Sequence, residues 1–94
     1  MHIVRSSKFI QTLKEQIKFI SLDSTKRALL FQDEIDKQIT TNLVHMPYKC
    51  RKSIYFNDEN IRDLIYKGYT VVYKIDETNA LITIIGMKKY TNEL

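Results

Sequence analysis

The spacing of apolar residues changes partway along the chain, and this change constrains the fold more than any other feature. Between residues 8 and 43, apolar side chains recur three and four positions apart, which places them on one face of an α-helix. From residue 61 onwards, short segments rich in β-branched and aromatic residues alternate with turn-forming residues, as in antiparallel strands. The sequence therefore predicts an α+β fold with helices packed on one face of a sheet.

Two helices are predicted in the first half of the chain, after a short strand at His2–Arg5. One amphipathic stripe runs through residues 8–22, and a second runs through residues 28–43 before Pro47. Serine or aspartate precedes each stripe and supplies an acceptor for the free amides at a helix start. Because the connection at residues 22–24 is short, the pair is expected to form an antiparallel hairpin.

Three strands are predicted in the second half, and together they form an antiparallel meander. They span Ile61–Tyr66, Tyr69–Ile75 and Leu81–Met87. The tight Lys67-Gly68 turn fixes the register of the first two strands, because a two-residue turn leaves the residues on either side directly paired. The predicted pairs are Tyr66 with Tyr69, Leu64 with Val71 and Arg62 with Tyr73. The register of the last strand stays open.

The two faces of this sheet are predicted to differ, because side chains alternate between faces along a strand. The face that holds the three predicted pairs is mostly apolar, and we expect it to cover the helices. The other face carries Asp63, Ile65, Thr70, Val72 and Lys74. This mixed composition favours contact with solvent or with a partner over a position in the core.

The composition excludes several classes of site. Cys50 is the only cysteine and the two histidines lie far apart, so neither an internal disulfide nor a metal-ligand spacing is available. No apolar segment approaches the roughly 20 residues of a membrane helix. We therefore expect one cytoplasmic domain over residues 1–94, without a metal or cofactor. The net charge of +4 favours an acidic partner.

The order of these elements resembles the RelE/ParE superfamily, the toxins of type II toxin–antitoxin systems. The segment FISLDSTKRALLFQDEIDKQI is similar to the ParE-type helix hairpin. The segment IRDLIYKGYTVVYKID resembles the second and third strands of the family, and ITIIGMKKY resembles its closing strand. The resemblance covers nearly the whole chain, and it rests on the order and spacing of segments that are each weak alone.

The resemblance implies a growth-inhibiting toxin that is neutralised by an antitoxin encoded beside it, in a toxin–antitoxin hetero-oligomer. It leaves the target open, because ParE-like members inhibit DNA gyrase and RelE-like members cleave mRNA on the ribosome. A third alternative is an inactive interaction module with the same fold. The residues of the site must separate these alternatives, because one fold hosts all of them.

RelE-like cleavage requires a base for the 2′-hydroxyl, an acid for the departing oxygen and cations beside the phosphate. The resemblance implies four candidate catalytic residues, which are Arg51, Arg62, Lys89 and Tyr90. Tyr90 matches the family in residue type and in place. No histidine or carboxylate is clearly placed to complete the site, since the internal histidine, His45, lies at a helix end. The nuclease site is therefore incomplete in the sequence.

The ParE-like alternative requires only a surface that holds gyrase. The length of the predicted hairpin and the sequence of its turn resemble ParE more than RelE, so the sequence favours gyrase inhibition. In that alternative the hairpin is the first surface to examine.

The segment YKCRKSIYF at residues 48–56 interleaves basic and aromatic residues, as do proteins that bind RNA without a strict code. Its aromatic side chains are expected to fill the end of the core. Its Ser53–Phe56 part is expected to add a strand or to pack beneath the loop. Its basic residues support phosphate binding, and thus a nuclease, only if they converge with those at the end of the last strand. The candidate binding residues are Lys49, Arg51, Lys52, Arg62, Lys88, Lys89 and Tyr90.

Two expectations about these candidates are more specific. Arg62 lies opposite Tyr73 in the predicted register, so a structural cation–π contact competes with a functional role. Charge reversal at Lys88 and Lys89 is expected to weaken antitoxin binding or toxicity if the end of the last strand is the shared surface.

Overall fold

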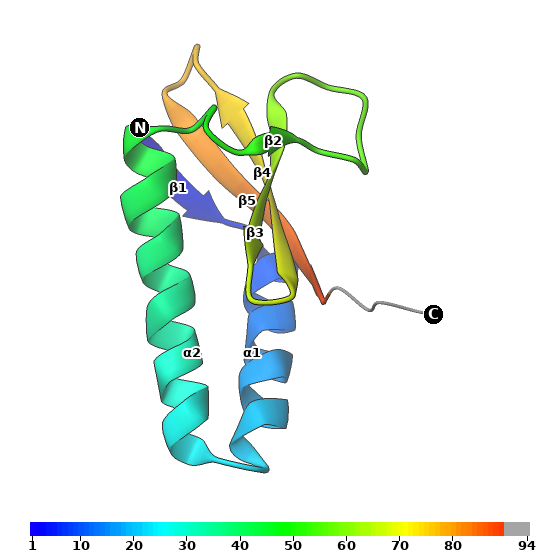
Figure 1. Ribbon diagram of the computed structural model, residues 1–94. Helices are drawn as coiled ribbons and strands as arrows, with labels where there is room; N and C mark the ends of the chain where they lie inside the picture. Colours follow the sequence, from blue (N-terminus) through cyan, green and yellow to red (C-terminus); the bar gives the residue numbers. More distant parts are fainter. Residues whose placement is uncertain (90–94) are drawn as a thin grey trace.

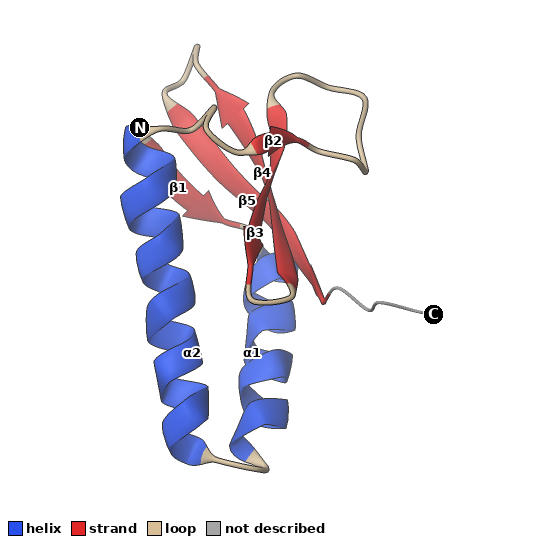
Figure 2. Cartoon of the chain, in the orientation of Figure 1, coloured by secondary structure: helices blue, strands red, loops and turns tan. Residues whose placement is uncertain are grey.

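The computed structural model describes residues 1–89 and has the predicted α+β architecture (Figure 1). Along the chain the elements are β1 (His2–Arg5), α1 (Ser7–Ser21), α2 (Thr25–Lys37), a π-helical segment η1 (Gln38–Leu43), β2 (Arg51–Lys52), β3 (Ile61–Tyr66), β4 (Tyr69–Asp76) and β5 (Leu81–Lys89). The two helices run antiparallel, and the end that carries their connecting turn extends well beyond the sheet (Figure 2). Across residues 1–89, the helices are too short or too polar to span a bilayer.

Serine side chains begin both helices, as the sequence predicts. Ser6 Oγ accepts a hydrogen bond from Phe9 N at 3.1 Å, and Ser24 Oγ accepts one from Arg27 N at 3.2 Å. Each bond satisfies an amide that has no partner within its own helix. Asp23, the aspartate that precedes the second helix, forms an ion pair with Arg27 instead of capping the helix.

The end of the second helix differs from the prediction, because η1 is π-helical. The prediction of one α-helix over residues 28–43 is therefore wrong for its last six residues. Apolar side chains in this region are buried four positions apart, at Phe31, Ile35, Ile39 and Leu43. At 3.6 residues per turn, such a series drifts around an α-helix by about 40° at each step. A wider π-helical turn keeps the last members of the series on the face that contacts the sheet.

The sheet has five strands in the order β1-β5-β4-β3-β2. Strands β3, β4 and β5 form the predicted antiparallel meander, while β1 pairs with β5 in parallel and β2 pairs with β3 in antiparallel orientation. All three predicted pairs between β3 and β4 are confirmed. The turn fits this register, because Lys67 and Gly68 have positive φ values of 43° and 80°, as a type I′ turn requires. The additional strand suggested for Ser53–Phe56 forms two residues earlier, at Arg51–Lys52.

A β-bulge in β5 settles the register that the sequence left open. Val72 pairs with Gly86 and Tyr73 pairs with Ile84, so Ile85 is an extra residue without a partner on β4. Because side chains alternate between faces, this insertion reverses the alternation for the rest of the strand.

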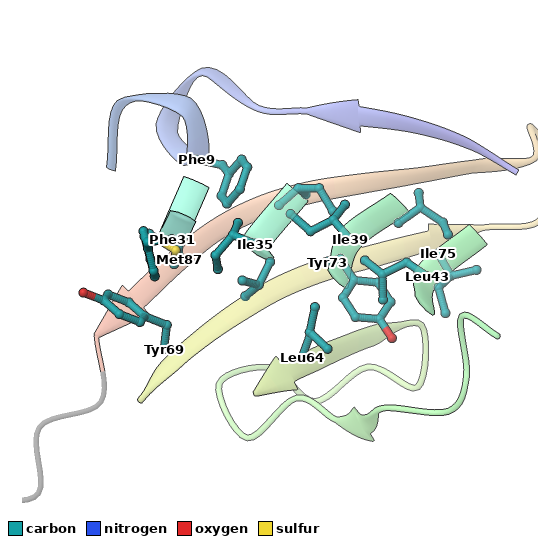
Figure 3. Close-up of a cluster of buried hydrophobic side chains, with 13 residues drawn as sticks. Phe9, Phe31, Ile35, Ile39, Leu43, Leu64, Tyr69, Tyr73, Ile75 and Met87 are labelled. Atoms are coloured by element: carbon teal, nitrogen blue, oxygen red, sulfur yellow. The ribbon is translucent and has the colours of Figure 1, made fainter. Parts of the chain in front are cut away.

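The buried side chains of both layers form one cluster between the helices and the sheet (Figure 3). The cluster contains Phe9, Phe31, Ile35, Ile39, Leu43, Leu64, Tyr69, Val71, Tyr73, Ile75, Ile82, Ile84 and Met87. Its strand residues lie on the face that the sequence predicts to cover the helices, so that assignment of faces is confirmed.

The opposite face of the sheet is more covered than predicted. Three of the five residues expected on an open surface are buried, namely Asp63, Thr70 and Val72. The expected mixed surface is therefore limited to Ile65 and Lys74. The physical reason is the connection between β2 and β3, which folds back on this face. Its backbone N–H at Ile54 donates to Asp63 Oδ2 at 3.2 Å.

Candidate functional site

The two lysines at the end of β5 point to opposite faces of the sheet. Lys89 Nζ lies 5.3 Å from the centroid of the Phe19 ring on α1, on the face that the helices cover. Lys88 Nζ lies 5.3 Å from the centroid of the Tyr55 ring, in the connection that covers the other face. These sequence neighbours therefore belong to different surfaces. Tyr90 lies outside the described residues.

Arg62 is held by neighbouring groups on several sides. Its Nε donates to Glu59 O at 2.9 Å, and its Nη1 donates to Cys50 O at 3.2 Å. Its Nη2 lies 3.6 Å from Glu59 Oε2, and its guanidinium lies 5.2 Å from the centroid of the Tyr48 ring. The expected stacking on Tyr73 is wrong, because these contacts hold the guanidinium over Tyr48. Arg62 thus ties the connection that follows η1 to β3.

Arg51 and Lys52 are also paired with carboxylates. Arg51 Nη2 lies 3.4 Å from Asp63 Oδ2, and Lys52 Nζ lies 3.2 Å from Glu59 Oε1. Lys52 and Glu59 are both exposed, so their pair contributes little to stability, whereas Arg51 pairs with a carboxylate that is fully buried. The pairs do reduce the positive charge that this segment presents to a ligand. Lys49 lines a shallow cleft of about 260 Å³ together with Arg51 and Asp63.

Asp63 is a buried carboxylate that organises this region. Its side chain is 0% exposed, and its Oδ2 accepts from Ile54 N and Arg51 Nη2. Within residues 1–89, its Oδ1 has no hydrogen-bond partner. A carboxylate is tolerated in such a place when it is hydrogen-bonded and paired, because burial of a lone charge is costly. Asp63 therefore fixes the path of the chain after β2.

The basic residues do not gather into the single cluster that phosphate binding would favour. Of the five whose convergence was in question, Lys49 and Arg51 line a common cleft. Lys52 pairs with Glu59, while the two lysines of β5 lie on opposite faces. Within residues 1–89, these five basic residues therefore do not form one cluster, and no group of three or more metal-ligating side chains is placed to hold an ion.

Tyr73 joins the sheet to the end of the second helix. Its ring is fully buried, and its hydroxyl donates to Pro47 O at 2.5 Å. Burial raises the pKa of Tyr73 well above its usual value, and the neighbouring Cys50 side chain adds to this effect. A phenol that holds its proton so firmly is a structural hydrogen-bond donor at neutral pH.

The aromatic residues of segment 48–56 do not fill the core as expected. Tyr48, Tyr55 and Phe56 are 40%, 43% and 44% exposed. Leu43 and Tyr73, both fully buried, occupy the end of the core instead.

The tip of the helix hairpin carries an apolar surface that sequence reasoning did not resolve into residues. Phe19 and Leu22 are 62% and 81% exposed. Together with Ile20, Asp23 and Arg27, they line a cleft of about 350 Å³. The sequence does carry a signal for this surface, because Phe19 and Leu22 are large apolar residues outside the buried stripe of α1.

A second hollow lies between the two helices, further from the tip. It has a volume of about 610 Å³ and includes the exposed side chains of Leu29 and Leu30 on α2. Arg5 and Asp36 close one side of it with an ion pair of 2.6 Å. The exposed apolar residues of the hairpin therefore continue along α2.

A comparison of the sequence with models of known protein families places the chain in a family. A family model described as "ParE toxin of type II toxin-antitoxin system, parDE" matches residues 3–88. The match spans every strand and helix of the fold except the first residue of β1 and the last residue of β5. No curated protein sequence gives a significant match.

Proposed function

The chain belongs to the ParE toxin family of type II toxin–antitoxin systems, and we propose that it inhibits DNA gyrase by binding through the tip of its α1–α2 hairpin. Membership of this family makes the chain the toxin component of such a system and gives it a cognate antitoxin as partner. Gyrase as the target and the hairpin as the contact surface are the proposal.

The exposed apolar tip of the hairpin is the observation that carries this proposal. Phe19 and Leu22 are large apolar side chains, yet more than half of each is exposed. Contiguous apolar surface of this kind marks protein–protein contacts, and an aromatic anchor beside a cleft is typical of an energetic hot spot. The turn between the helices also extends beyond the sheet, so a large partner can reach it (Figure 1).

The basic residues support a protein target over mRNA cleavage. Arg51 and Arg62 are already paired with Asp63 and Glu59, and a cation that is already paired offers less stabilisation to a phosphate in its transition state. Lys89 lies against Phe19, which adds a positive charge beside the apolar tip. This combination suits an apolar protein surface that carries carboxylates.

The test is gyrase-catalysed supercoiling of relaxed plasmid in the presence of increasing amounts of this protein. The wild-type chain is expected to inhibit supercoiling, and Leu22→Lys is expected to require at least about tenfold more protein for the same inhibition. Met46→Lys is the matched control, because Met46 is 59% exposed and lies at the other end of the second helix. Both substitutions alter exposed positions, so unfolding temperatures should stay close to that of the wild type.

A parallel mRNA-cleavage assay on translating ribosomes separates the alternatives. Untouched gyrase together with cut mRNA would overturn the proposal and assign RelE-like activity. Normal growth when the chain is expressed alone, with both assays negative, would identify an inactive interaction module.

A further inference from the structure

The connection between β2 and β3 carries a run of exposed apolar residues that the hairpin proposal does not use. Ile54, Tyr55 and Phe56, here named the 54–56 patch, are 66%, 43% and 44% exposed. Consecutive exposed residues of this type are unusual on a loop unless they serve an interaction. The patch lies at the end of the molecule away from the hairpin tip (Figure 1).

The loop that presents this patch is held by specific hydrogen bonds. Asp63 Oδ2 accepts from Ile54 N at 3.2 Å, and Ser53 Oγ accepts from Tyr55 N at 3.2 Å. Both acceptor residues are buried, with exposed fractions of 1% and 4%. A loop ordered in advance loses less conformational entropy when a partner binds. The patch is therefore a preorganised surface.

The charges around the patch indicate what kind of partner fits it. Lys88 Nζ lies 5.3 Å from the Tyr55 ring, and within residues 1–89 no carboxylate lies within ion-pair distance of it. The patch thus offers an apolar centre beside one positive charge, which complements a segment with apolar and acidic residues side by side.

The same charges disfavour a nucleic acid as occupant. Lys52 and Arg62 share Glu59 as an ion-pair partner, which reduces the positive charge of this loop. Asp58 and Glu59 belong to the same loop, and their carboxylates repel a phosphate backbone. Single-strand binding by stacking needs an uncompensated positive groove as well as aromatic rings.

We infer that the 54–56 patch and Lys88 form a docking surface for an acidic amphipathic segment of the antitoxin. Family membership supplies the partner, and the exposed loop and its charges supply the location. The inference does not depend on gyrase being the target of the toxin.

The test is calorimetric titration of the purified chain with the full-length product of the adjacent gene. Ile54→Lys and Lys88→Glu are each expected to weaken binding by at least about tenfold, because they place a charge in the apolar centre or reverse the complementary charge. The matched controls are Met46→Lys for the apolar substitution and Lys74→Glu for the charge reversal, since both control positions are exposed. The controls should bind with the affinity of the wild type.

Three results would overturn this inference. One is unchanged antitoxin affinity in both patch variants, and another is no binding by the wild-type chain. The third is binding of a labelled single-stranded RNA that Lys88→Glu abolishes while antitoxin affinity stays the same, which would assign the patch to nucleic acid. Supercoiling assays keep the two proposals apart, because the patch variants should inhibit gyrase as the wild type does, whereas Leu22→Lys should bind the antitoxin normally.

Discussion

Removal of the Tyr73 hydroxyl is expected to destabilise the fold, because that group joins β4 to the main chain just after the second helix. The ring of Tyr73 is fully buried, and its hydroxyl donates to Pro47 O at 2.5 Å. In Tyr73→Phe, the Pro47 carbonyl loses its donor in a part-buried position, and an unsatisfied group of this kind costs about 1–3 kcal/mol. We expect the free energy of unfolding to fall by about 1–2 kcal/mol, since part of the carbonyl can regain water.

Thermal unfolding followed by circular dichroism measures this loss against a matched control. A change of 1 kcal/mol shifts the midpoint of a domain of this size by roughly 4–8 °C, so Tyr73→Phe should unfold roughly 5–15 °C below the wild type. Tyr69→Phe is the control, because the Tyr69 hydroxyl donates at 3.1 Å to Gln16 Oε1, an acceptor on a half-exposed side chain. Equal midpoints for the two variants would refute the role assigned to the Pro47 contact.

The same substitution predicts a change in the alkaline pH dependence of stability. Burial raises the pKa of Tyr73 in the folded state above the value of about 10 for an unfolded chain. The stabilisation linked to this group is complete below that value and is lost as the pH rises towards the folded pKa. The stability difference between the wild type and Tyr73→Phe should therefore narrow above roughly pH 10.

Two further predictions concern the β3–β4 turn and its contact with α2. Gly68→Ala should lower the free energy of unfolding in urea titrations by about 1 kcal/mol, because φ at Gly68 is +80°. Gly86→Ala should instead raise it by about 0.4–1 kcal/mol, because no atom lies within 4 Å of the added Cβ and the unfolded chain loses conformational freedom. The hydrogen bond from Tyr66 holds the pKa of Glu34 below its usual value, so the stabilisation linked to Glu34 is present above that usual value and is lost as the pH falls through the lowered pKa. Tyr66→Phe should raise the pKa of Glu34 in an NMR titration, and an unchanged pKa would assign the shift to Lys67.

Features that depend on residues close in sequence could be predicted from the sequence. The register of β3 and β4 follows from the Lys67-Gly68 turn, because two residues with positive φ leave one way to pair the flanking strands. The helix caps follow for the same reason, since Ser6 and Ser24 act on amides within one turn of the chain.

The burial of the outer face of the sheet could not be predicted in this way, because the segment that covers it is distant in the sequence. The alternation of β3 places Asp63 on a face that appears open when the strands are considered alone. The connection after β2 then folds over that face and buries the carboxylate beneath Ile54. The partners of Arg62 come from the segments on both sides of β2, because Tyr48 precedes this strand and Glu59 follows it.

The faces to which Lys88 and Lys89 point depend on one inserted residue of β5, Ile85. Without the bulge at Ile85, Lys88 would point towards the helices and Lys89 away from them, which is the reverse of what is observed. Gly86 was the available signal, because an isolated glycine inside a strand often marks a bulge. Pairing with β4 determines that one residue is inserted, and this number determines which face each later residue of β5 points to.

The positions of the two proposed surfaces constrain how one antitoxin could act on both. The β2–β3 connection lies at the end of the molecule away from the turn between the helices (Figure 1). The two surfaces approach each other at the end of β5, because Lys88 contacts the Tyr55 ring of the patch and its neighbour Lys89 contacts the Phe19 ring of the hairpin. An antitoxin segment that follows the end of β5 can therefore contact both surfaces. A shorter contact at the patch would anchor the antitoxin and leave the hairpin tip exposed, so anchoring and neutralisation would then belong to different parts of the antitoxin chain.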